Sequence, residues 1–227
     1  MMLYVIFGVF ALLSWIVSSR LKSKFAKYSR VSVQMTGAEV AQRMLRENGI
    51  YDVTVRPTSG SLTDFYDPRN KTINLSEDVY ASRSVAAAAV AAHETGHAIQ
   101  HAEAYSFLEL RTALVPLQNV SAKVLNIIFI AMFAFAFFMP AFIPFAGIII
   151  IAAYSILTLF SVVTLPVEIN ASKRAVNWLT DTGIVVGETR DNAIDALKWA
   201  AYTYVVAALS SIATLLYYII RFTGNRD

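Results

Sequence analysis

The sequence predicts a mainly α integral membrane protein with about four transmembrane helices and a small α+β cytoplasmic portion. Of the 227 residues, 56% are hydrophobic and only 15% are charged, whereas a soluble domain of this length carries more charge. Apolar runs long enough to cross a bilayer occur in three regions, and strand-like and helix-like patterns lie between the first two. All the histidines of the chain, three in number, fall in one of those helix-like patterns.

The apolar runs set the number of spans. The middle region, Val124–Val167, holds no charged residue over 44 positions. This length is enough for two helices of about 20 residues each, with Pro140 and Pro144 marking the turn between them. A first span at 1–19 and a last one at 200–220 bring the predicted total to four.

The basic residues predict which side of the membrane each loop faces. No Lys or Arg precedes the first apolar run, whereas five follow it closely: Arg20, Lys22, Lys24, Lys27 and Arg30. The positive-inside rule then places residues 20–123 and 168–199 in the cytoplasm. The expected location is a bacterial plasma membrane that the chain crosses several times, with both long loops on the cytoplasmic side.

Helical patterns occur at three places in the predicted loops. Thr36–Glu39 fits a capping box and starts an amphipathic helix at about 37–48. Ser82–Tyr105 is rich in alanine and predicts a buried helix that carries the histidines. Residues 188–198 predict a short amphipathic helix that leads into the last span.

Two short β-prone runs precede the histidines. They are Val53–Val55 and Lys71–Leu75, and they flank a segment rich in turn-forming residues. The pattern predicts a small antiparallel sheet, which has to pack on the following helix because an isolated hairpin is marginally stable. We expect Lys71–Leu75 to be an edge strand.

The residues His93-Glu94-Thr95-Gly96-His97 form an HExxH sequence. Residues four apart share one face of a helix, so both imidazoles can meet one metal ion. Neutral imidazoles suit Zn²⁺, and a third protein ligand would leave a fourth position for water. Glu94 can lie beside that water and take its proton. Because the chain has only three histidines, this spacing argues against a chance pentapeptide.

His101 is a poor third ligand. It lies about 12 Å along the helix axis from His93, so three imidazoles cannot converge tetrahedrally on one ion. We expect His101 to support the site from outside or to lie at the surface.

A carboxylate is therefore needed from elsewhere in the chain. Between Glu109 and Asp181 the single acidic residue is Glu168. An ionisable group at the edge of a membrane is costly without a partner, and a two-histidine, one-carboxylate zinc site needs such a group. The alternative is an interfacial ion pair of Glu168 with Lys173 or Arg174.

At this point the sequence resembles a family. The segments HETGHAIQH and LPVEINASKRA are similar to those of the YugP-like membrane zinc metallopeptidases (neutral zinc metallopeptidase family 2). The similarity extends to MTGAEVAQRML, SLTDFYDPRNKTINLS and ALKWAAYTYVVAALSS. The resemblance implies a zincin-like fold of the gluzincin type, with His93, His97 and Glu168 binding one Zn²⁺ per chain. It also implies that Glu94 is the catalytic acid and base of a zinc-dependent endopeptidase.

The resemblance leaves the supporting residues open. Related membrane gluzincins often have an Asp four residues after the distal Glu, where it orients a ligand histidine, but this chain has Ser172 there. Asn170 and Asp64 are alternatives for that role. The candidates for stabilising an oxyanion are Tyr66, Tyr80 and Arg174.

Other functions compete with peptide hydrolysis. A non-hydrolytic metal-binding scaffold or an assembly factor would not need Glu94. The expected partners are membrane lipids and a peptide or protein substrate, which Lys71–Leu75 would align as an extended strand. A net charge of +3 without a long basic run argues against a nucleic-acid partner.

The predicted sidedness can be tested by cysteine labelling, because the natural chain has no cysteine and gives no background. Single cysteines at Lys24, Lys71 and Arg190 should react with an impermeant maleimide only after cells are opened. A cysteine at Arg226 should react on intact cells. Labelling of positions 71 and 190 from opposite sides would contradict a site shared by His93 and Glu168.

Overall fold

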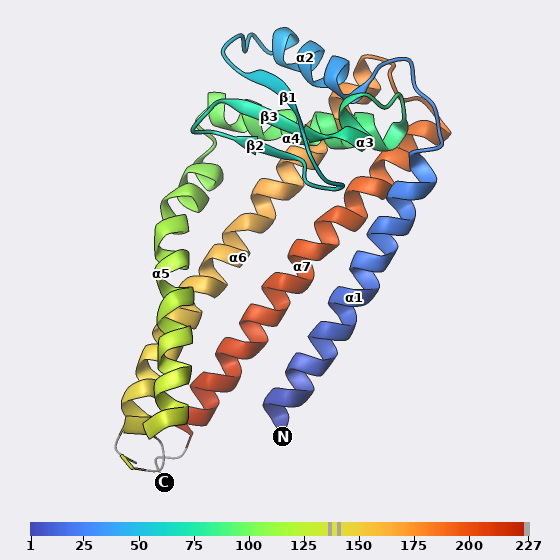
Figure 1. Cartoon of the computed structure of the whole chain (residues 1–227). Helices are drawn as coiled ribbons and strands as arrows, with labels where there is room; N and C mark the ends of the chain where they lie inside the picture. Colours follow the sequence, from blue (N-terminus) through green and yellow to red (C-terminus); the bar gives the residue numbers. More distant parts are fainter. Residues whose placement is uncertain (136–137, 140–141, 225–227) are drawn as a thin grey trace. The chain divides into compact units, whose positions relative to one another are not determined.

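The computed structural model describes the chain except residues 136–137, 140–141 and 225–227. The described part is mainly helical and contains a three-stranded sheet (Figure 1). The helices are α1 (Met2–Tyr28), α2 (Gly37–Glu47), α3 (Glu77–Tyr80), α4 (Val85–Ala102), α5 (Ser106–Phe135), α6 (Phe142–Asp181) and α7 (Glu188–Thr223). The strands are β1 (Thr54–Thr58), β2 (Phe65–Asp67) and β3 (Thr72–Ser76).

Four of the described helices, α1, α5, α6 and α7, are long and apolar enough to cross a membrane. Their ends do not coincide with the ends of the apolar runs. α6 has 40 residues and is about 60 Å long, twice the thickness of a hydrocarbon core of about 30 Å. The predicted boundaries after residues 19, 123, 167 and 199 therefore all fall inside helices.

Helix α5 begins well before the predicted span. It starts at Ser106, so the residues from Val124 to Phe135 form only its last part, which rises about 18 Å. Pro144 lies in the first turn of α6 rather than in the connecting turn. A helix tolerates proline there because the first N–H groups have no partner within the helix. Pro140 lies outside the described residues.

The chain divides into two compact units. One, the apolar unit, comprises Met1–Trp15, Glu109–Leu165 and Tyr204–Asp227. The other, the mixed unit, comprises Ile16–Leu108 and Pro166–Thr203 and contains the sheet. Each unit has its own hydrophobic core. All the residues that the sequence singled out as site candidates belong to the mixed unit.

Helix α4 lies at the centre of the mixed unit. It lies against α2, α3, β2 and β3 (Figure 1). Its first half, Val85–Ala92, is fully buried apart from Val90. A helix that is enclosed on all sides has no exposed polar face, so its sequence shows no amphipathic pattern. The run of alanines in α4 agrees with this position. The helix starts three residues later than predicted because Ser84 adopts an extended conformation and caps it, accepting from the Ala87 N–H at 3.2 Å.

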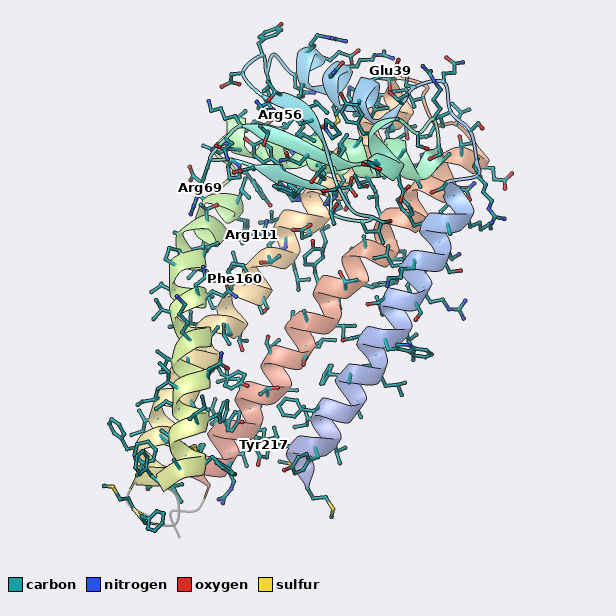
Figure 2. All side chains as sticks on the ribbon, viewed as in Figure 1. Glu39, Arg56, Arg69, Arg111, Phe160 and Tyr217 are labelled. Carbon is teal, nitrogen blue, oxygen red and sulfur yellow. The ribbon has the colours of Figure 1, made fainter. Side chains whose placement is uncertain are left out.

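The capping box that was predicted for α2 is present. The Thr36 N–H donates to Glu39 Oε2 at 2.7 Å, and the Glu39 N–H donates to Thr36 Oγ1 at 3.2 Å. Glu39, labelled in Figure 2, also forms an ion pair with Arg83 at 3.2 Å. Glu39 therefore caps the start of α2 and also connects α2 to the loop before α4.

The predicted antiparallel pairing of the two β-prone runs is wrong. β1 and β3 pair in parallel, with Val55 opposite Ile73. A parallel pair needs a connection long enough to bring the chain back to the same end of the sheet. The turn-rich segment is this connection, and it also contains β2, which pairs antiparallel with β3. The turn between β2 and β3 is closed by Asp67, whose carboxylate accepts from the N–H groups of Arg69 and Asn70.

The expected edge position of Lys71–Leu75 is also wrong. The strand order is β1-β3-β2, so β3 is the central strand and β2 is an edge strand. Pro57 in β1 agrees with this order, because proline lacks a ladder donor and is confined to edge strands. The edge strand β2 contacts α4.

Close packing of α4 on α6 predicts the effect of Gly96→Ala. A Cβ at Gly96 would lie 2.9 Å from the Ala171 carbonyl oxygen and 3.2 Å from the Ala171 Cα, and both are backbone atoms. The helix-propensity gain of about 1 kcal/mol is outweighed by overpacking of about 1–3 kcal/mol. We expect a lower thermal unfolding midpoint in detergent. Gly8→Ala, where nothing lies within 4 Å, is the matched control, and equal midpoints for the two variants would contradict the close packing.

Candidate metal centre

Two helices bring three potential metal ligands together. His93 and His97 lie one turn apart on α4, and Glu168 comes from α6. Their ligand atoms lie within 4.8 Å of one another, with Glu168 Oε2 at 3.2 Å from His93 Nε2 and 3.5 Å from His97 Nε2. Ligands at 2.0–2.1 Å from a tetrahedral ion lie about 3.3 Å apart. The separations of Glu168 Oε2 from the two histidine nitrogens match that geometry.

The charge and burial of the centre favour a cation. Glu168 is only 2% exposed and His97 8%. Burial alone would lower the pKa of His97, but its contact with Glu168 and the negative charge of Glu94 raise that pKa above its usual value. Arg174, an alternative partner for Glu168, forms a bidentate ion pair with Glu103.

The outer ring nitrogens of both histidines are hydrogen-bonded. Ser172 Oγ lies 3.1 Å from His93 Nδ1, and Gln100 Oε1 lies 3.0 Å from His97 Nδ1. These contacts turn the Nε2 atom of each ring toward Glu168. Ser172, at the position where the resemblance leads us to expect aspartate, therefore contacts one of the candidate ligand histidines itself.

The other two candidates for supporting a ligand histidine lie elsewhere. Asn170 accepts from Gln100 at 2.9 Å, so it is one residue removed from His97. Asp64 accepts from the Ser76 N–H at 2.7 Å and fixes the end of β3. Burial raises the pKa of Asp64, and the charge of Glu94 raises it further.

Glu94 faces the edge strand β2. Its Oε2 accepts from the Tyr66 N–H at 3.0 Å, and the Tyr66 hydroxyl lies 2.8 Å from His101 Nδ1. Glu94 and His101 are seven residues apart and share one face of α4. His101 is exposed and lies outside the cluster of three ligand atoms.

No oxyanion candidate is singled out by its contacts. The Tyr66 hydroxyl is bonded to His101, and the Arg174 guanidinium is bonded to Glu103. Tyr80 packs against the hydrophobic core of the mixed unit.

Comparison with known proteins identifies the family of the chain. The family described as "Putative neutral zinc metallopeptidase" matches residues 3–223. The chain belongs to this family. Over 229 residues it is 40% identical to the "Putative membrane protease YugP" of Bacillus subtilis (strain 168), a match that covers 100% of this chain and 99% of that protein. No solved structure matches.

Membership of this zinc metallopeptidase family implies zinc, and the donor set fits that ion. Two imidazole nitrogens and one carboxylate oxygen are a ligand set of catalytic zinc sites, which keep a fourth position open. The resemblance seen in the sequence is thereby confirmed at the level of the family.

Sequence reasoning missed Gln100. It is fully buried and contacts His97, Val167 and Asn170. The available signal was its position three residues after His97, on the same face of the helix.

The metal centre predicts opposite behaviour for Glu168→Gln and His101→Ala. Removing the anionic ligand should weaken zinc binding by more than the roughly 10- to 100-fold that loss of a supporting residue causes. His101→Ala should keep its zinc, because this ring lies outside the cluster. Metal analysis of the two purified variants measures the zinc that each retains. A zinc-free His101 variant beside a zinc-loaded Glu168 variant would contradict the assignment.

Proposed function

We propose that the protein is a membrane-embedded, zinc-dependent endopeptidase. The observation that carries this proposal is the convergence of His93, His97 and Glu168, with Glu94 next to the first histidine and facing an edge strand. The family and the membrane protease relative support it. A non-hydrolytic scaffold would use the three ligands and leave Glu94 without a task.

Each residue of the centre has a proposed role. His93, His97 and Glu168 would hold one zinc ion per chain, which supplies Lewis acidity for a water molecule and a peptide carbonyl. Glu94 takes a proton from the attacking water and gives it to the departing amine. The Tyr66 N–H holds one carboxylate oxygen of Glu94 in place for both transfers.

The edge strand β2 is the proposed guide for the substrate. It replaces Lys71–Leu75 in that role, because β3 is central and β2 lies beside Glu94. An extended peptide that adds to a sheet edge is held by main-chain hydrogen bonds, which tolerate many side chains.

The membrane arrangement is part of the same proposal. α1, α5, α6 and α7 would cross the bilayer, and the basic residues that follow the first apolar run favour a cytoplasmic site. Lipids and a peptide or protein are the proposed partners. The location is a bacterial plasma membrane.

Glu94→Gln separates an enzyme from a metal-binding scaffold. The change keeps the shape of the side chain and removes the base, so zinc content should stay constant while peptide cleavage falls by about 10²-fold or more. The assay follows cleavage of an unfolded protein by the reconstituted protein, with and without a chelator. Equal cleavage by wild type and variant would exclude this mechanism.

A further inference from the structure

We propose that Gln100 is a positioning residue that sets the tautomer of His97 and holds α4 and α6 in register at the metal centre. This inference rests on the proposed zinc site and assigns a task to a residue outside the ligand set. It follows from which of the groups around the Gln100 amide can donate hydrogen bonds and which can only accept them.

The Gln100 amide uses all of its hydrogen-bonding groups. Its Oε1 lies 3.0 Å from His97 Nδ1, and its Nε2 lies 2.9 Å from both the Val167 carbonyl oxygen and Asn170 Oδ1. The side chain is fully buried, so water cannot replace any of these contacts. Two amide hydrogens and one carbonyl oxygen thus meet three protein groups.

The neighbours decide which end of the amide faces which group. The Val167 carbonyl can only accept, so the Gln100 nitrogen has to face it. Arg174 Nε, 2.7 Å from Asn170 Oδ1, can only donate, so Asn170 presents its oxygen and also requires the Gln100 nitrogen. Arg174 is itself fixed by its bidentate pair with Glu103. A flipped Gln100 amide would place two acceptors against each other twice.

The proton on His97 follows from this orientation. Because Gln100 Oε1 can only accept, the neutral His97 ring carries its hydrogen on Nδ1 and a lone pair on Nε2. That lone pair lies 3.5 Å from Glu168 Oε2, so a bound cation, or a second proton that makes the ring an imidazolium, fits between the two atoms. His93 differs, because the Ser172 hydroxyl both donates and accepts and leaves the tautomer of His93 open.

Gln100 also acts across the two helices. It binds His97 on its own helix and the backbone of Val167, the residue that precedes Glu168, on α6. A single side chain therefore fixes a ligand on α4 and the helical turn that carries the ligand on α6. Removing its amide should disturb both.

The tautomer can be measured on the zinc-free protein with ¹⁵N-labelled histidine, since the chain has only three histidines. At alkaline pH we expect the His97 ring to show a protonated Nδ1 and an unprotonated Nε2, assigned by replacing each of the other two histidines. A His97 ring protonated at Nε2 in the wild-type protein would overturn the proposal, whatever any variant does.

Gln100→Met, which keeps the length and removes the amide, tests the consequence. We expect a mixture of His97 tautomers and zinc binding weakened by about 10- to 100-fold. Ser84→Ala is the control, because it weakens α4 at its N-terminal cap, far from the ligands, and should leave the tautomer and the zinc affinity unchanged.

A pure Nδ1–H tautomer in Gln100→Met, or equal losses of zinc affinity in both variants, would overturn the positioning role. Absence of zinc binding by the wild type would instead refute the proposed function. The tautomer of the zinc-free protein would still decide the assignment of Gln100.

Discussion

The close approach of α4 and α6 is the constraint on which the candidate metal centre depends. An HExxH helix supplies two ligands on one face, so the third has to come from another element whose backbone lies very near. Here His93 and Glu168 are 75 positions apart in the chain, and their ligand atoms are 3.2 Å apart. Gly96 makes the approach possible, because it faces the backbone of Ala171 with no room for a methyl group. α2, α3, β2 and β3 pack around α4 and hold it there.

Small side chains bring helices together but do not fix their register. A face of glycine and alanine offers little to stop one helix from sliding along another. Polar side chains supply the missing specificity at this contact: Ser172 bonds His93, and Gln100 bonds both His97 and the Val167 carbonyl. A buried polar group left without its partner costs about 1–3 kcal/mol, so a slipped register is penalised at several groups at once.

The sequence predicts the features that depend on neighbouring residues and not those that depend on distant pairing. The Thr36 capping box is local, and Glu168 was found because its region holds no other acidic residue. The strand β2 was missed because three residues between turns carry almost no periodic signal, and its absence reversed the inferred pairing of β1 and β3. Gln100 was missed for a related reason: an amide acquires a direction only when its partners on α6 are known. Hydropathy likewise marks where a helix is apolar and not where it ends, as α5 shows.

The continuous course of α6 links the centre to the rest of the chain. This helix contains both a long apolar run and Glu168, with Pro166 two residues before the ligand. Proline lacks an N–H, so the turn that leads to Glu168 has one backbone hydrogen bond fewer than a regular helix. Gln100 on α4 donates a hydrogen bond to the carbonyl oxygen of Val167, the residue after Pro166. This bond connects the weakened turn of α6 to α4. The position of the Glu168 carboxylate therefore depends on the contact with α4 as well as on α6 itself. A fragment that ended before α6 would retain both histidines and lose Glu168, the third candidate ligand.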